Sequence, residues 1–188
     1  SISVKKGDTN VIKIIGKNQL QKINITIPGD PSSAAFFCAL TILNTNCKLK
    51  IKNVQLNRTR IGFYEILKKS GAKIKFNNVK LKNGERIGDI SVKSSKLKPL
   101  RASKVFYPKT ADEYPILFVI ASLIKGCSEF KGIGDLANKE SNRILEMKKI
   151  LNKIGVKFLY SKDKVKIYGT MKKDYKNLKI TVPRLGDH

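Results

Sequence analysis

The sequence has few cysteines, few acidic residues and no long apolar run. Cys38, Cys47 and Cys127 lie far apart and form no CxxC pair. Free cysteines in apolar segments behave as small hydrophobic residues, and so few of them exclude a disulfide-stapled scaffold and indicate a reducing compartment. No stretch approaches the ~18 to 20 consecutive apolar residues of a membrane-spanning helix, and the N-terminal residues lack the apolar run of a signal peptide. We therefore expect a cytoplasmic protein without a membrane partner.

The charge is strongly one-sided, because 39 Lys and Arg against 14 Asp and Glu give a net charge of +25. Such an excess is typical of proteins that bind nucleic acids or other polyanions. However, only six of the basic residues are arginine, and the lysines occur in nearly every segment without interleaved aromatic residues that could stack on bases. We therefore favour a solvated basic surface over a nucleic-acid surface, and attraction of a small anionic substrate is the third interpretation.

An internal repeat covers most of the chain. The chain has 188 residues and 41% hydrophobic content, enough for one domain with a sizeable core. The segment 66–73 returns as 150–157 with five of eight residues identical, and Asp30 and Asp112 each open a long apolar stretch. One repeated unit of helices and strands cannot bury both of its faces alone, so the helices of successive units are expected to pack together around a common axis.

Both units have the same predicted order of elements. Asp30, Ser32 or Ser33 can cap the first helix, which is apolar on nearly every side and is therefore predicted to be buried. Glycines mark the ends of the amphipathic helices, and strict alternation marks the half-buried strands. The first unit has helices at 31–43 and 61–70 and strands at 47–54, 73–76 and 90–93. The second has helices at about 112–124 and 139–154 and strands at 128–131, 156–160 and 164–168.

The predicted fold class is α/β (α+β), with pseudo-threefold repeats of a βαβαββ unit, buried helices and outer mixed sheets. The residues 180–187 echo 25–30 and suggest the start of a third copy. We expect residues 1–20, with a strand at 11–15, to belong to a neighbouring domain. Residues 21–188 then form an incomplete domain with repeats at about 21–95 and 96–170.

Two short segments place unusual polar residues at the starts of predicted helices. Asp112 and Glu113 precede a strongly apolar helix, where acidic residues commonly interact with the helix dipole. Lys139 and Arg143 are four residues apart, so a helix would project both from one face, close to backbone N–H groups that favour anions. The alternatives are a simple helix cap for the first segment and an exposed surface of paired charges for the second, and spacing alone leaves them open.

Three segments together resemble the 5-enolpyruvylshikimate-3-phosphate synthase family. They are IPGDPSSAAFF at 27–37, ADEYPIL at 111–117 and NKESNRI at 138–144, in the order and at the approximate spacing of the family. NRTRIG at 57–62 is similar to the bacterial branch described as class II, and GDH at 186–188 resembles the start of the family's next motif. The resemblance runs from about Val11 to His188.

The resemblance implies transfer of the enolpyruvyl group of phosphoenolpyruvate to the 5-hydroxyl of shikimate 3-phosphate, with release of phosphate, in the shikimate pathway of aromatic amino acid biosynthesis. It also implies an active site between two closing domains, so we expect this chain alone to have negligible activity. No metal or other cofactor is expected. Asp112 and Glu140 match the catalytic acids, Lys139 and Arg143 match ligands of shikimate 3-phosphate and phosphoenolpyruvate, and Asp135 matches a contact of the shikimate ring.

Two other functions were weighed against this one. The UDP-N-acetylglucosamine enolpyruvyl transferase shares the fold but normally relies on a reactive cysteine in a polar loop, a place that none of the three cysteines occupies. A basic nucleic-acid-binding module of related fold would explain the charge, but we expect no nucleic-acid partner. Steep salt dependence of RNA binding would favour that module, whereas weak binding would favour the transferase.

Overall fold

Helices and strands recur in the same order in two successive segments of the computed structural model, which describes residues 2–5, 11–14, 22, 24–139, 141–170 and 179. The first segment contains α1 (Pro31–Leu43), β3 (Lys48–Gln55), α2 (Gly62–Lys69), β4 (Lys73–Lys82) and β5 (Glu85–Lys93). The second contains β6 (Arg101–Ala102), the 3₁₀ helix η1 (Lys104–Lys109), α3 (Tyr114–Ser122), β7 (Gly126–Lys131), the 3₁₀ helix η2 (Gly134–Asn138), α4 (Arg143–Lys153), β8 (Lys157–Ser161) and β9 (Lys164–Gly169). Ahead of both, β1 (Ile2–Lys5) pairs antiparallel with β2 (Val11–Ile14).

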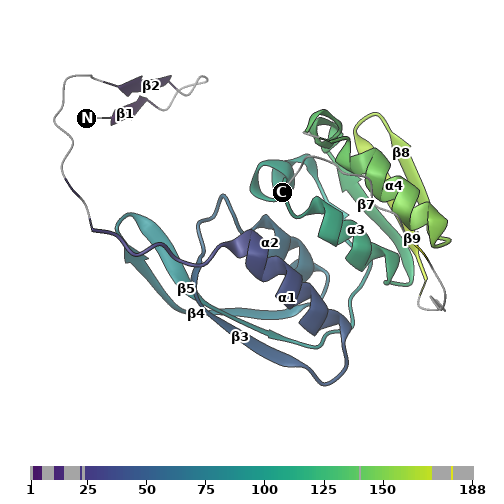
Figure 1. The fold of residues 1–188 in the computed structure, drawn as a ribbon, viewed down its shortest axis with the longest axis horizontal. Helices are drawn as coiled ribbons and strands as arrows, with labels where there is room; N and C mark the ends of the chain where they lie inside the picture. The colour runs from purple at the N-terminus through teal and green to yellow at the C-terminus, as the bar shows by residue number, and fades with distance from the viewer. Residues whose placement is uncertain are drawn as a thin grey trace.

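Each segment builds one sheet and covers one side of it with its own helices (Figure 1). The first sheet has the order β3-β5-β4 and is antiparallel. The second has the order β6-β7-β9-β8 and is mixed, because the short strand β6 runs parallel to β7. A parallel bridge between Gly29 and Val54 stands at the corresponding place in the first segment, just ahead of α1. The two helical layers meet where α1 contacts α3.

The core is formed where apolar side chains of the helices meet the inner faces of the sheets. Its aromatic centre in the second segment joins Tyr114 and Phe118 of α3 to Phe130 of β7 and Phe158 of β8. Their rings lie 5.1 to 6.0 Å apart, mostly edge to face, the arrangement that the ring quadrupoles favour. This packing fixes α3 on its sheet and so fixes the residues that immediately precede α3.

The mixed α/β fold is confirmed, and so is the strand at 11–15, within one residue. The three-fold repeat and the domain boundaries stay predictions, and the predicted third copy at 180–187 lies outside the described residues. None of the helices in the described ranges is long and apolar enough to cross a membrane.

Two expectations about helices were wrong. The α1 helix is not buried on every side, because Phe36, Phe37 and Leu40 are 61 to 64% exposed and no described segment covers them. The helix expected from residue 139 begins only at Arg143, because the chain first forms η2 and the Asn142 side chain then caps α4. Lys139 therefore lies outside the helix with an extended backbone.

Asp89 in the central strand β5 holds two irregular positions in the flanking strands. Asn53 in β3 and Asn78 in β4 both have positive φ, at the points where the registers with β5 shift. The Asp89 carboxylate accepts hydrogen bonds from the Asn53 backbone N–H at 3.1 Å and the Asn78 side-chain amide at 2.8 Å. It also pairs with Lys50 at 3.1 Å. One carboxylate thus stabilises two β-bulges.

We predict that this carboxylate makes the stability of the fold depend on acid pH. The hydrogen bond from Asn78, followed by those from Asn53 and Lys50, lowers the pKa of Asp89 to about 2 from an ordinary value of 3.8. A lowered carboxyl pKa contributes stability that is present above the unfolded pKa and is lost as pH falls through the folded pKa. Urea unfolding should show Asp89→Asn less stable than the unsubstituted chain at pH 7, with the difference shrinking between pH 4 and pH 2. A difference that stays constant over this range would contradict the prediction.

Candidate active site

Asp112 and Arg143, 31 residues apart in the sequence, form an ion pair. Asp112 lies in the turn of residues 110–113 that leads into α3, here called the acidic turn, and Arg143 is the first residue of α4. The Arg143 Nη1 donates to Asp112 Oδ1 at 3.0 Å. The Arg143 side chain is only 13% exposed, whereas that of Asp112 is 63% exposed. A largely buried guanidinium thus faces an exposed carboxylate, and a ligand can approach that carboxylate from solvent.

Tyr107 and Asp135 lie beside this pair. The Tyr107 hydroxyl donates to Asp135 Oδ2 at 2.6 Å, and its ring stacks on that of Tyr114. Burial, and then the hydrogen bond with Asp135, raise the pKa of Tyr107, and the charges of Arg143 and Asp112 also act on this hydroxyl. Tyr107 therefore stays neutral at physiological pH, and its hydroxyl bonds Asp135 within electrostatic reach of the Asp112–Arg143 pair.

The other two predicted site residues have different outcomes. Lys139 follows η2 directly and is half-buried, but it does not share a helix face with Arg143 as the spacing had suggested. Glu140 lies outside the described residues. The structure therefore brings together Asp112, Arg143 and Asp135 from three separate segments, and places Lys139 four residues ahead of Arg143.

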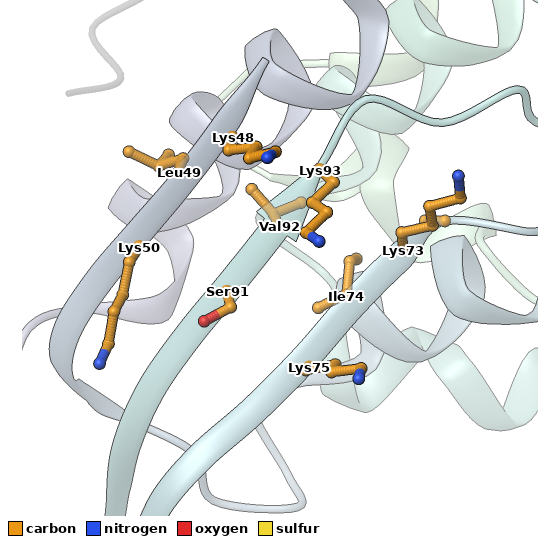
Figure 2. A pocket seen from close by; sticks show the side chains of 10 residues that line it. Lys48, Leu49, Lys50, Lys73, Ile74, Lys75, Ser91, Val92 and Lys93 are labelled. Carbon is orange, nitrogen blue, oxygen red and sulfur yellow. The ribbon is translucent and has the colours of Figure 1, made fainter. Parts of the chain in front are cut away.

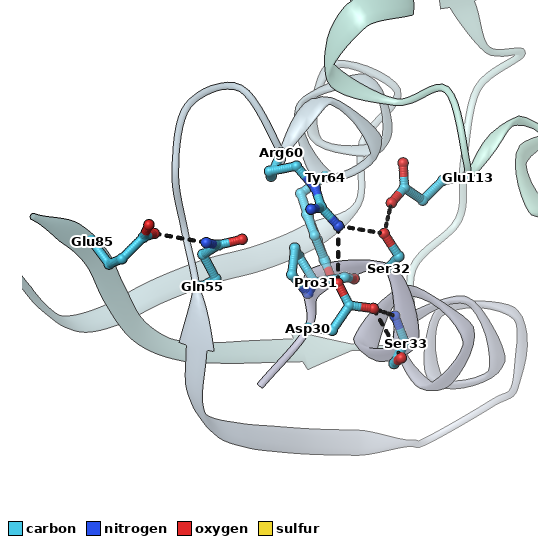
Figure 3. Close-up of polar contacts among 9 residues, drawn as sticks. All are labelled: Asp30, Pro31, Ser32, Ser33, Gln55, Arg60, Tyr64, Glu85 and Glu113. Carbon is cyan, nitrogen blue, oxygen red and sulfur yellow. Dashed lines mark hydrogen bonds and ion pairs between the residues drawn. The ribbon is translucent and has the colours of Figure 1, made fainter. Parts of the chain in front are cut away.

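A second polar cluster was missed by sequence reasoning (Figure 3). Glu113 is buried, and its carboxylate accepts a hydrogen bond from the Ser32 hydroxyl. Ser32 in turn accepts one from the Arg60 guanidinium at 3.2 Å, and the same nitrogen donates to Asp30 at 3.0 Å. All four residues lie in segments that carry the family resemblance, which is the signal that could have pointed to them. The acidic turn is thereby tied to the start of α1.

Asp30 is the N-cap of α1, one of the three alternatives that the sequence left open. Its Oδ2 accepts from the Ser33 backbone N–H at 2.8 Å and from the Ser33 hydroxyl at 2.9 Å. Burial acts to raise the pKa of Asp30, but these bonds outweigh it and hold the pKa below its ordinary value. Ser32 is thus not needed as a cap, and its hydroxyl is available to Glu113.

The arrangement around Asp112 suits proton transfer from a hydroxyl and recognition of an anion. An exposed carboxylate can accept a proton, and a guanidinium can bind a carboxylate or phosphate with two parallel hydrogen bonds. The N-cap of α3 is Glu113, and its side chain makes no capping hydrogen bond, so an interaction of the acidic turn with the helix dipole stays the alternative. Within the described ranges no three His, Cys, Asp or Glu residues are grouped to hold a metal ion.

A basic hollow of about 440 Å³ lies elsewhere, on the sheet of the first segment (Figure 2). Lys48, Lys93 and Lys73 face one another in register across β3, β5 and β4. The lining contains no aromatic residue on which a base could stack. The hollow thus offers positive charge without the features that distinguish a nucleic-acid site.

The cysteines do not provide a reactive thiol at the candidate site. Cys38 is buried in α1, and burial raises the pKa of its thiol to about 12. Cys47 precedes β3 and Cys127 lies within β7, both half-buried. A thiol with a raised pKa is a poor nucleophile, so Cys38 cannot serve the cysteine-dependent chemistry considered above.

We predict that neutralising Glu113 stabilises the fold at neutral pH. Burial raises the pKa of Glu113, so the folded state holds its proton more tightly than the unfolded chain. Stability must then fall as pH rises above the unfolded value, since the carboxylate is charged in a buried place. Glu113→Gln, which keeps an oxygen to accept from Ser32, should have a higher Tm than the unsubstituted chain at pH 7 and the same Tm near pH 4. A lower Tm at pH 7 would show that the charge itself stabilises the fold.

Comparison with known proteins places these segments in a family. Residues 1–188 match the family described as EPSP synthase (3-phosphoshikimate 1-carboxyvinyltransferase). The 3-phosphoshikimate 1-carboxyvinyltransferase of Thermodesulfovibrio yellowstonii is 44% identical over 156 residues, covering 82% of this chain and 36% of that protein. The enzyme of that name from Zymomonas mobilis is 37% identical over 171 residues, covering 90% and 38%.

A solved structure agrees with both sequence comparisons. The structure of EPSP synthase from Acinetobacter baumannii matches with a TM-score of 0.81 and 34% identity, over 90% of this chain and 38% of that chain. The chain thus spans well under half the length of the relatives that it matches. On the matched residues and the shared fold, the chain belongs to the EPSP synthase family.

Proposed function

We propose that the protein containing this chain transfers the enolpyruvyl group of phosphoenolpyruvate to the 5-hydroxyl of shikimate 3-phosphate and releases phosphate. The Asp112–Arg143 ion pair carries this proposal, because it joins two segments that resemble the family at a place open to solvent. The relatives named above carry the name 3-phosphoshikimate 1-carboxyvinyltransferase, and that name describes the same reaction.

The reaction needs two proton transfers that carboxylates can perform. A proton leaves the 5-hydroxyl as its oxygen bonds to the central carbon of phosphoenolpyruvate, and another is delivered to the methylene carbon; phosphate is then eliminated. We assign Asp112 and Glu140 to these transfers, without deciding which acid serves which step. A pair of acids in different environments can have the different pKa values that such paired transfers require.

The cations are assigned to the anionic groups of the substrates. We propose that Arg143 binds the carboxylate or phosphate of phosphoenolpyruvate, and that Lys139 binds the phosphate of shikimate 3-phosphate. Asp135, held by Tyr107, contacts the shikimate ring. Before substrate binds, the Asp112 carboxylate compensates the charge of the largely buried Arg143. Both substrates are anions, and the net charge of +25 favours their encounter with this chain.

We further propose that residues 21–188 form part of a larger domain and that residues 1–20 belong to its neighbour. The exposed apolar face of α1, with Phe36, Phe37 and Leu40, supports this proposal, because such faces are normally covered. The share of each relative that the chain covers is in keeping with it. The active site would then be complete only in the longer protein, which we place in the cytoplasm because Cys38, Cys47 and Cys127 are free thiols.

A direct test uses the longer protein that contains this chain. Asp112→Asn should lower kcat by roughly 10²- to 10⁴-fold, the usual contribution of a positioned acid or base. Arg143→Ala should raise the KM for phosphoenolpyruvate by about 10-fold or more, since its charged hydrogen bonds are lost. Release of phosphate in the presence of both substrates is the measurement, and residues 1–188 alone should release none above background. Turnover near that of the unsubstituted protein in both variants would defeat the assignment.

A further inference from the structure

The acidic turn, residues 110–113, is held from more than one side. On one side is Arg143, which pairs with Asp112. On a second side is the start of α2, where Gly62 approaches so closely that an added Cβ would lie 1.9 Å from Thr110 Oγ1 and 2.9 Å from the Lys109 carbonyl oxygen. Only glycine fits there without moving the turn.

The third side is the start of α1. Here the Ser32 hydroxyl donates to the buried carboxylate of Glu113, the residue next to Asp112. The Ser32 oxygen also accepts from Arg60 at 3.2 Å, so it stands between a cation and an acid. Arg60 is itself oriented by Asp30, whose other oxygen is occupied by Ser33 (Figure 3). We call the chain of hydrogen bonds through Arg60, Ser32 and Glu113 the Arg60–Ser32–Glu113 network.

Fold stability alone does not account for a carboxylate at position 113. Glu113 is 5% exposed, and burial raises its pKa although the Ser32 hydroxyl, its own backbone N–H and the charge of Arg60 act to lower it. Burial of a carboxyl group with so little compensation costs free energy, and an apolar residue of similar size would usually be at least as stable. A role in fixing the neighbouring residue explains why a hydrogen-bonding side chain stands at this point.

We propose that the Arg60–Ser32–Glu113 network positions the acidic turn, and that Arg60, Ser32 and Glu113 are positioning residues for the carboxylate of Asp112. This inference rests on the proposed function, because it takes Asp112 as a reacting group. Ser32 is the central element, since it is the only described side chain that bonds both Arg60 and Glu113. The first segment thereby controls the geometry of a group in the second.

The physical consequence is a loss of turnover without a loss of binding. If the turn is released, Asp112 moves relative to the hydroxyl from which it takes the proton, and a misplacement of about 1 Å can lower a rate by roughly 10²-fold. Arg143 is anchored in α4 and keeps its place, so the KM for phosphoenolpyruvate should change little.

The experiment compares five variants of the longer protein that contains this chain. Ser32→Ala removes both bonds of the network, Arg60→Ala removes the bond from Arg60 to Ser32, and Glu113→Ala removes the acceptor of the Ser32 hydroxyl. Glu113→Gln is the conservative variant, because its amide oxygen still accepts from Ser32. Asp89→Ala is the matched control, because it removes another hydrogen-bonded carboxylate, in β5, whose partners Asn53 and Asn78 lie outside the acidic turn.

We expect Ser32→Ala, Arg60→Ala and Glu113→Ala to lower kcat by about 10- to 100-fold with KM within twofold, and Glu113→Gln to restore kcat to within about threefold. Asp89→Ala should lower Tm and leave kcat unchanged per folded molecule. The positioning role is overturned if the three alanine variants keep full kcat per folded molecule, or if Glu113→Gln is as slow as Glu113→Ala. Absence of transferase activity in the unsubstituted protein would instead overturn the proposed function, so the two failures can be told apart.

Discussion

The candidate active site depends on the ion pair between Arg143 and Asp112. A guanidinium that is 13% exposed needs a partner, since a buried cation without one destabilises a fold by several kcal/mol. Asp112 meets that need from a turn between a 3₁₀ helix and α3, while remaining 63% exposed itself. The pair therefore joins the acidic turn to α4. It also holds the Arg143 guanidinium against an exposed carboxylate that an anionic ligand can displace.

The fold serves this pair by making its surroundings rigid. The aromatic cluster of Tyr114, Phe118, Phe130 and Phe158 fixes α3 below the acidic turn. The Asn142 cap fixes the first turn of α4, from which Arg143 projects. The start of α1 reaches the same turn through Ser32. Rigid support of this kind is what a site needs to hold reacting groups in place.

Much of this fold could be predicted from the sequence, because its signals are local. Strict alternation at 47–54 and the helical stripe at 61–70 located β3 and α2 to within about one residue. The helix expected from residue 139 was wrong for a reason that periodicity does not contain, namely that residues 134–138 form a 3₁₀ helix and that Asn142 caps α4. The exposure of Phe36 was missed because an apolar run does not say how many of its sides are covered.

The candidate site was predictable only in part, because a sequence motif is a local signal and the site is assembled by the tertiary structure. The resemblance named Asp112, Arg143 and Asp135 individually, but only the tertiary structure shows which of them lie close together. Tyr107, which holds Asp135, lies in no motif that the sequence pointed to. Glu113 stood beside Asp112 in the motif, yet only its burial and its bond to Ser32 distinguish the two acids. Side chains that act through another residue leave no pattern in a single sequence.

The most direct measurement of the central claim is a crystal structure of the longer protein with shikimate 3-phosphate and an unreactive analogue of phosphoenolpyruvate. Our prediction is that Asp112 lies within about 2.6 to 3.2 Å of a shikimate hydroxyl and that Arg143 has turned from Asp112 to the anionic group of the analogue. Both ligands bound elsewhere, with the Asp112–Arg143 pair intact at its present 3.0 Å, would contradict it.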